Sequence, residues 1–163
     1  MTDPKSSGVR RALVIGDGSW GTTLAIRLAR NGIDTVLWSA FPDHAETMAR
    51  DRANETYLPG IAFPENLVPS ADPFAAADGV DLVVSVVPTQ YVGQVALRFE
   101  DALKGDIPVV TASKGLEIET FRTPSQILRR VLGDRCICVL TGPSHAEEVA
   151  RDLPASVVAG CEN

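Results

Sequence analysis

The sequence predicts an α/β fold in which a doubly wound, mostly parallel sheet carries helices on both faces. Two observations indicate it: short apolar runs alternate with helix-like segments, and these runs are continuously apolar instead of alternating with polar residues. Strands buried on both faces show such runs, and strands that alternate with helices form parallel sheets. With 163 residues, 45% of them hydrophobic and 22% charged, the chain has the size and composition of one globular domain.

The first predicted unit is a strand, a helix and a second strand. Residues 1–9 read as a flexible lead-in, and the apolar run ALVIG then begins after Arg11. A helix is expected from Ser19 to Asn31, followed by a strand at 35–38. Gly32 is well placed to end the helix, because glycine readily adopts the left-handed conformation that stops one.

The same alternation continues to the end of the chain. A helix is expected at 43–53, followed by a proline-rich connection, YLPGIAFPENLVPSADP, that contains at most a short strand. Further strands are expected at 81–87, 107–113, 136–140 and 155–159. Further helices are expected at 89–103, 123–132 and 144–151.

Composition excludes several classes of partner. The formal net charge is −6 and the basic residues are scattered, which argues against a nucleic-acid surface. The longest apolar runs fall short of the roughly 18 residues that a membrane-spanning helix needs, so no span is expected. The polar start MTDPKSSGVRR lacks the apolar centre of a secretory signal. We therefore expect a cytoplasmic protein.

The three cysteines are expected to be reduced thiols. Cys136 and Cys138 would project from the same face of one strand, which is a poor geometry for a mutual disulfide. Cys161 stands apart near the end of the sequence. Because no pair of cysteine or histidine residues has the spacing of a zinc site, we expect no metal.

A glycine-rich turn lies between the first strand and the first helix. In Gly16-Asp17-Gly18-Ser19-Trp20-Gly21, Gly16 permits a tight turn, Gly18 lets the backbone approach a pyrophosphate, and Gly21 lets helix and strand pack closely. The helix N-terminus offers free N–H groups to the anion. This placement predicts a Rossmann-like, dinucleotide-binding domain over residues 10–163.

The choice between NAD and NADP stays open. An acidic residue near the end of the second strand usually binds the ribose hydroxyls and repels a 2′-phosphate. Here that place reads Trp38-Ser39-Ala40-Phe41; Asp34 comes too early and Asp43 too late. Neither an acidic residue nor an arginine stands there, so the cofactor is NAD or NADP.

Three further segments follow predicted strands, where open parallel sheets bind ligands. They are Val87-Pro88-Thr89-Gln90, Ser113-Lys114-Gly115-Leu116-Glu117 and Thr141-Gly142-Pro143-Ser144-His145-Ala146. Lys114 could supply positive charge to an anionic substrate, or be an ordinary solvated lysine. Residues Gly142 to Ser144 open a helix, whose N–H groups and the Ser144 hydroxyl could meet a polar ligand. The structural alternative is N-capping by Ser144 or Thr141.

Four motifs in order, GDGSWGTTLA, VVPTQ, SKGLE and GPSHAEEVA, carry a family resemblance. The chain resembles the N-terminal domain of NAD(P)-dependent glycerol-3-phosphate dehydrogenase of the bacterial type. The resemblance extends from about Arg11 to the last residue, and Tyr57-Leu58-Pro59 also fits. It implies reduction of dihydroxyacetone phosphate to sn-glycerol 3-phosphate, a route into glycerophospholipid synthesis, with a homodimer possible in the full-length enzyme.

The resemblance also implies roles for individual residues. Cofactor contacts are implied for the glycine turn, Pro88, Lys114 and Ala146, with Ser19 and Trp20 prominent in the turn. Substrate contacts are implied for Lys114, Gly142 and Ser144. Lys114 thus touches both ligands and acts on the substrate electrostatically. The general base and the residues that bind the substrate phosphate are implied on a helical domain downstream of Asn163, so residues 1–163 alone are expected to lack turnover.

Some positions depart from the family pattern. His145 stands where a phenylalanine is usual, and a histidine beside a reaction centre could titrate near neutral pH; the alternative is a polar surface residue at a helix start. The family often carries an arginine or another polar residue near Ala40. His44 lies on a stretch that we expect to be exposed, and we assign it no role.

Two other functions remain open on the sequence. A related hydroxyacid dehydrogenase or ketopantoate reductase would share the cofactor domain, but SKGLE and GPSHAEE favour the first reading. A non-catalytic dinucleotide sensor would need no further domain.

Overall fold

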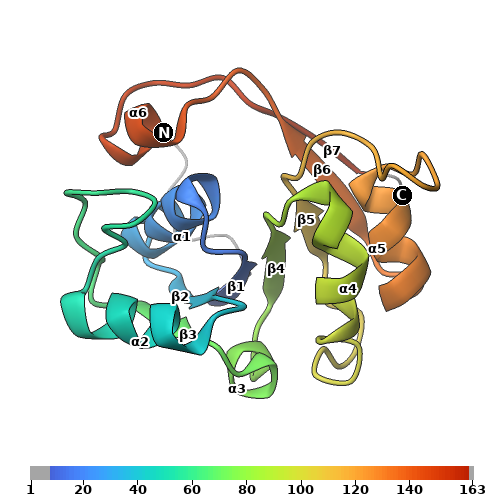
Figure 1. The fold of residues 1–163 in the computed structure, drawn as a ribbon, viewed down its shortest axis with the longest axis horizontal. Coiled ribbons are helices and arrows are strands. Elements are labelled where there is room, and N and C mark those ends of the chain that lie inside the picture. Colours follow the sequence, from blue (N-terminus) through green and yellow to red (C-terminus); the bar gives the residue numbers. More distant parts are fainter. Residues whose placement is uncertain (1–7, 162–163) are drawn as a thin grey trace.

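The computed structural model describes residues 8–161 (Figure 1). Its strands are β1 (Arg11–Ile15), β2 (Asp34–Trp38), β3 (Leu67–Ser70), β4 (Leu82–Ser85), β5 (Val109–Thr111), β6 (Ile137–Thr141) and β7 (Val158–Cys161). Its helices are α1 (Ser19–Arg30), α2 (Pro42–Asp51), α3 (Pro73–Ala77), α4 (Val92–Leu97), α5 (Pro124–Leu132) and α6 (Ala146–Ala150). A 3-10 turn, η2 (Thr89–Tyr91), leads into α4.

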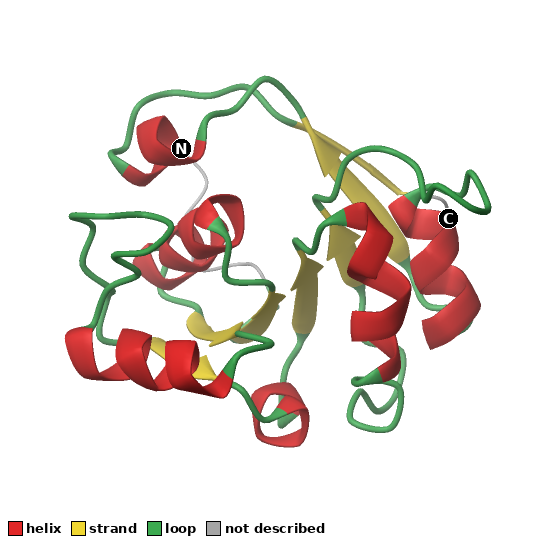
Figure 2. Ribbon diagram, viewed as in Figure 1, coloured by secondary structure: helices red, strands yellow, loops and turns green. Residues whose placement is uncertain are grey.

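The strands form one sheet in the order β3-β2-β1-β4-β5-β6-β7 (Figure 2). β1 to β6 pair in parallel, whereas β7 runs antiparallel to β6. The order reverses between β1 and β4, because β2 and β3 lie on one side of β1 and the later strands on the other. The predicted doubly wound, mostly parallel sheet is confirmed. Most of the predicted lead-in, 1–9, lies outside the described residues.

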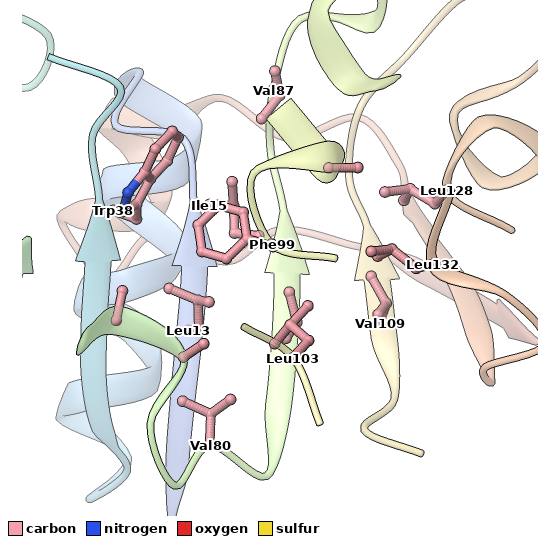
Figure 3. Close-up of a cluster of buried hydrophobic side chains, with 14 of the residues drawn as sticks. Leu13, Ile15, Trp38, Val80, Val87, Phe99, Leu103, Val109, Leu128 and Leu132 are labelled. Atoms are coloured by element: carbon pink, nitrogen blue, oxygen red, sulfur yellow. The ribbon is translucent and has the colours of Figure 1, made fainter. Parts of the chain in front are cut away.

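Alternate residues of the strands bury themselves on opposite faces of the sheet. Leu13 and Ile15 of β1 belong to a cluster with residues of α3, α4 and α5 (Figure 3). Val14, between them, packs instead with residues of α1, α2 and α6. Because both faces are covered, the strands carry apolar residues at successive positions, which explains their continuous apolar runs.

Local signals set one end of each of two helices, and the sequence predicts the one at Gly32. α1 ends at Arg30 with Asn31 as its C-cap, and Gly32, which follows, has a φ of 82° and donates its N–H to Ala29 O at 2.9 Å. α5 begins with a reciprocal cap: the Thr123 hydroxyl accepts from Gln126 N, and the Gln126 side chain accepts from Thr123 N. Both positions satisfy backbone groups that the end of a helix would otherwise leave unpaired.

Other element boundaries differ from those predicted. The helix expected at 89–103 is the shorter α4 after a 3-10 turn, and residues beyond Leu97 form further turns. α3 was not predicted; it begins with Pro73 and is capped by Asp72, whose carboxylate accepts from Phe74 N and Ala75 N. α3 escaped prediction because a five-residue helix is too short to show a periodic apolar pattern. The last strand begins at Val158, not at 155.

A carboxylate ties the beginning of β1 to that of β4. Asp81 Oδ2 accepts hydrogen bonds from Arg10 N at 2.8 Å and Arg11 N at 3.0 Å. These two backbone hydrogen bonds lower the pKa of Asp81 below its ordinary value. The ionised carboxylate therefore stabilises the folded protein at neutral pH, and this stabilisation is lost as the pH falls through the lowered pKa of Asp81.

The expectation of three reduced cysteines is wrong for two of them. β7 turns back against β6 and places Cys161 directly opposite Cys138. The two residues form a disulfide, with their Cα atoms 4.2 Å apart. Cys136 keeps an exposed free thiol, as its strand geometry indicated. The sequence argument failed because it treated Cys161 as isolated, whereas antiparallel pairing brings residues distant in sequence side by side.

We predict that alkylation of the unreduced protein labels Cys136 and that labelling extends to Cys138 and Cys161 after treatment with a dithiol. Sulfurs held in a disulfide are not nucleophilic, whereas a free exposed thiolate is. Peptide mass spectrometry reads out the labelled positions. A Cys136→Ser control should show no labelling before reduction. Labelling of all three cysteines in the unreduced, folded protein would contradict the pairing.

Candidate functional site

A cleft of about 750 Å³ opens at the carboxyl ends of the strands. It lies where the strand order reverses between β1 and β4, the place where open α/β sheets bind their ligands. The loops after β1, β2, β4 and β5 contribute to its walls. Residues that line it include Gly16, Gly18, Ala40, Pro88, Arg98 and Lys114.

Two glycines of the turn after β1 are required by close packing. A Cβ on Gly21 would lie 1.9 Å from the carbonyl oxygen of Gly16, which no side chain tolerates. Gly16 has a φ of 111°, and a Cβ there would lie 2.7 Å from Val86 O. These contacts bring α1 and β4 against the end of β1, as the glycine pattern predicts.

Gly18 is different, because nothing in the fold requires a glycine there. Its φ is −62°, and an added Cβ would meet no atom within 4 Å. Gly18 is the N-cap of α1, whose first turn holds no acidic side chain. The positive end of the helix dipole and its free N–H groups thus face open space that a side chain would fill. This geometry fits the pyrophosphate of a dinucleotide.

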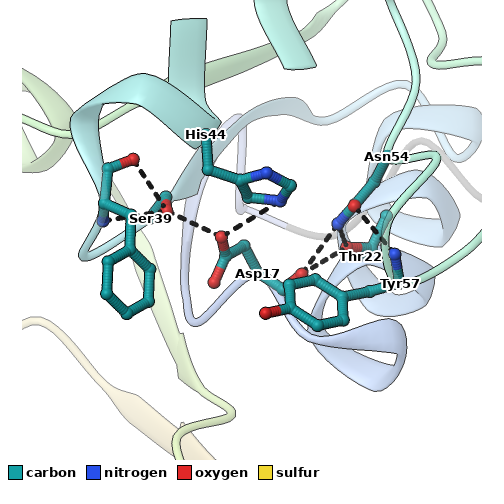
Figure 4. A network of polar contacts seen from close by, with 7 residues as sticks. Asp17, Thr22, Ser39, His44, Asn54 and Tyr57 are labelled. Atoms are coloured by element: carbon teal, nitrogen blue, oxygen red, sulfur yellow. Dashed lines mark hydrogen bonds and ion pairs between the residues drawn. The ribbon is translucent and has the colours of Figure 1, made fainter. Parts of the chain in front are cut away.

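Asp17, which has no role in the glycine pattern, lies at the centre of a polar network (Figure 4). Its Oδ2 accepts a hydrogen bond from Ser39 Oγ at 2.6 Å and lies 3.5 Å from His44 Nε2. Its backbone oxygen accepts from Asn54 Nδ2 at 2.7 Å and from Thr22 Oγ1 at 3.1 Å. The side chain of Asp17 is 12% exposed.

The structure corrects the expectation for His44. Its side chain is 17% exposed, since α2 turns it toward Asp17, and its ring packs edge-on against Tyr57 with centroids 5.5 Å apart. Two features of the sequence could have indicated this network: the charged Asp17 inside the glycine turn and the histidine His44 on the helix after β2.

Lys114 lies across the cleft from the glycine turn. The Thr89 hydroxyl donates to Lys114 O at 2.6 Å, and the Ser113 hydroxyl donates to Val87 O at 2.5 Å. These bonds join the loops after β4 and β5 and fix the backbone of the lysine. Its ammonium reaches to 3.4 Å from Gly142 O and bridges to the loop after β6.

The segment after β6 differs in part from the prediction. α6 begins at Ala146 with His145 as its N-cap, and no side-chain cap bond forms, so neither Ser144 nor Thr141 caps it. Gly142 has a φ of 152°, and a Cβ there would lie 2.5 Å from Ser156 O. His145 is exposed, and Ser144 is half-buried.

The segment also rests on α1. Thr23 Oγ1 donates to Ala146 O at 3.0 Å, so Ala146 lies beside the helix that follows the glycine turn. Ser19 and Trp20 form the first turn of α1, but Trp20 lines a separate hollow with Leu140 and Val149. The structure therefore gathers Gly16, Gly18, Pro88 and Lys114 in one cleft, and Trp20 faces away into the other hollow.

The cleft and the strand order agree with a match to a known family. A family model described as NAD-dependent glycerol-3-phosphate dehydrogenase N-terminus matches residues 11–163. The chain belongs to this family. The resemblance drawn from the four sequence motifs is thereby confirmed.

Curated relatives carry the same assignment over most of the chain. Glycerol-3-phosphate dehydrogenase [NAD(P)+] of Shewanella halifaxensis is 42% identical over 151 residues, which are 91% of this chain and 44% of the relative. The enzyme of the same name from Shewanella sp. strain MR-4 is 45% identical over 149 residues, covering 90% and 44%. The chain spans less than half the length of these relatives.

Solved structures share the fold. The crystal structure of glycerol-3-phosphate dehydrogenase from Coxiella burnetii superposes with a TM-score of 0.90 at 34% identity, covering 94% of this chain and 47% of that one. A ketopantoate reductase from Ralstonia eutropha superposes with a TM-score of 0.62 at 22% identity, covering 80% and 40%. The second likeness shows a common fold alone.

We predict that Gly18→Val abolishes NADH binding and leaves the melting temperature nearly unchanged. The valine would stand in open space at the N-terminus of α1, where it would keep the pyrophosphate from the backbone. Calorimetric titration measures the affinity, and a thermal melt measures the stability.

The matched control is Gly21→Ala, in which the added methyl group meets Gly16 O. That overpacking should destabilise the fold by about 1–3 kcal/mol or more. Unchanged affinity for NADH in a folded Gly18→Val protein would refute the pyrophosphate site.

Proposed function

We propose that this domain binds NAD(H) or NADP(H) and serves a glycerol-3-phosphate dehydrogenase that interconverts dihydroxyacetone phosphate and sn-glycerol 3-phosphate. The observation that carries the proposal is Gly18, which the fold leaves open at the N-terminus of α1, facing a cleft that Lys114 also lines. The relatives' printed name, glycerol-3-phosphate dehydrogenase [NAD(P)+], supports the substrate. The product would feed glycerophospholipid synthesis.

Each wall of the cleft has a distinct task in this proposal. The first turn of α1 holds the pyrophosphate, while Pro88 and the loop after β4 border the nicotinamide side. The bound cofactor supplies or accepts the hydride. Lys114 places a positive charge near the substrate oxygen that gains negative charge during reduction. Gly142 and Ser144, on the loop that the lysine contacts, offer polar groups to the same substrate.

A ketopantoate reductase or hydroxyacid dehydrogenase is the alternative enzyme, and a dinucleotide sensor is the alternative without catalysis. The ketopantoate reductase likeness is limited to the fold. A sensor needs no cation beside the nicotinamide, so Lys114 at the cleft favours an enzyme.

The helices and the net charge bear on the cellular setting and the partners. In residues 8–161, each helix is too short or too polar to cross a membrane. We place the enzyme in the cytoplasm with a small phosphate ester as its substrate, and a homodimer is the expected assembly of the full-length form. The net charge of −6 remains the argument against a nucleic-acid partner.

We predict that Lys114→Met, in a full-length enzyme that carries this domain, lowers kcat/KM for dihydroxyacetone phosphate by at least about 100-fold, the scale of losing one stabilising group. The melting temperature should change little, because an exposed lysine contributes little to folding. Steady-state kinetics with NAD(P)H measures the effect.

The control is Lys104→Met, which removes an exposed lysine that borders a different hollow. It should leave kcat/KM within about twofold of the wild type, since a charge outside the cleft is screened by solvent and salt. Near-normal kinetics of the Lys114→Met enzyme would remove the role assigned to this residue. Equal turnover of ketopantoate would instead support the alternative enzyme.

A further inference from the structure

The end of β2 is the place where dinucleotide-binding domains discriminate between NAD and NADP. An acidic residue there accepts hydrogen bonds from the ribose hydroxyls and repels the 2′-phosphate of NADP. In this chain Ser39, Ala40 and Phe41 follow β2, and none of them is charged. The residues that follow β2 in the sequence therefore do not supply the carboxylate that usually discriminates between the two cofactors.

In three dimensions a carboxylate does reach this place, but from the glycine turn (Figure 4). Ser39 directly follows β2, and its hydroxyl donates to Asp17 Oδ2 at 2.6 Å. Asp17 also lines the cleft. Across residues 8–161, Oδ1 of Asp17 takes part in no hydrogen bond or ion pair. One carboxylate oxygen therefore holds the end of β2, and the other remains free to accept from a ligand hydroxyl.

We propose that Asp17 is the specificity-determining residue that makes this domain prefer NAD(H) to NADP(H). Its free oxygen accepts a hydrogen bond from the adenosine ribose of NAD(H), and its charge repels the 2′-phosphate of NADP(H). The inference rests on the proposed function, because it requires a dinucleotide in this cleft. It deepens that function by assigning the choice of cofactor to a residue that is not on β2.

The carboxylate is held where it cannot avoid a 2′-phosphate. The backbone oxygen of Asp17 is fixed by Asn54 Nδ2 and Thr22 Oγ1, and its side chain is fixed by Ser39. Turning the side chain aside would break the 2.6 Å bond from Ser39. With 12% of the side chain exposed, solvent screens the charge far less than at an open surface.

Three cationic or basic side chains nearby bear on the same choice. His44 Nε2 lies 3.5 Å from Asp17 Oδ2 and would offset the negative charge if protonated. The Arg98 guanidinium lies 5.3 Å from the ring centroid of Trp38 and also lines the cleft. Arg98 thus contacts Trp38, the last residue of β2, whereas Asp17 contacts Ser39, the residue after it. Lys114 contacts the loop after β6 instead.

The test is a titration of the chain with NADH and with NADPH at about pH 8, where histidine is ordinarily neutral. The wild type is compared with Asp17→Asn, which keeps the size of the side chain and removes its charge. Asp43→Asn is the matched control, because it removes one exposed acidic charge from the first turn of α2. Arg98→Gln tests the opposing charge.

We expect the wild type to bind NADH at least about 10-fold more tightly than NADPH, as a like charge beside the 2′-phosphate requires. Asp17→Asn should reduce this ratio by at least about 10-fold, mainly through tighter NADPH binding. Asp43→Asn should leave the ratio unchanged, and Arg98→Gln should not reverse it.

Several results would overturn the assignment. They are equal affinity of the wild type for both cofactors, an unchanged ratio in Asp17→Asn, an equal loss of both affinities in that variant, and NADPH preference that depends on Arg98. Wild-type binding of neither cofactor would overturn the proposed function as well, so the two failures are distinguishable.

A second measurement needs no variant. Adenosine 5′-monophosphate and adenosine 2′,5′-bisphosphate differ by the 2′-phosphate, and competition of each against bound NADH compares their affinities in the wild type. The proposal requires the bisphosphate to compete at least about 10-fold more weakly. Equal or stronger competition by the bisphosphate would contradict it even if Asp17→Asn failed to fold.

Discussion

The approach of α1 to β1 at the glycine turn is the constraint on which the rest of the site depends. A single methyl group on Gly21 would collide with the carbonyl of Gly16. Because the backbone packs so closely there, the N-terminus of α1 faces the cleft directly. The same closeness fixes the peptide of Asp17 and thereby directs its carboxylate toward β2.

The strand order then decides what can meet at that turn. β1 lies between β2 and β4, so loops that are far apart in sequence converge around the same helix N-terminus. One side brings the polar network of Ser39 and His44, and the other brings Pro88 and Lys114. The carboxylate of Asp17 and the ammonium of Lys114 therefore line different parts of one cleft.

Much of the fold and part of the site could be predicted from the sequence, because those features are local. Continuous apolar runs marked the parallel strands, and the three glycines stood at positions defined by their own turn. Features that depend on pairing across the fold escaped prediction. The opposition of Cys138 and Cys161 needs the antiparallel return of β7, and the contact of Asp17 with Ser39 needs the end of β2 to lie beside the glycine turn. In the sequence, neither member of either pair indicates its partner.

The contact of Gly142 with residues 156 and 157 bears on how the loop between β6 and β7 can change in length. A Cβ on Gly142 would lie 2.5 Å from Ser156 O and 2.9 Å from Val157 Cα, so the two stems of the loop touch at its base. Between these stems the loop carries α6, which rests on α1. Since closure is already achieved at the base, lengthening the turn after α6 adds little entropic cost. We therefore expect insertions in that turn to leave the strands and the contact between Gly142 and Lys114 in place.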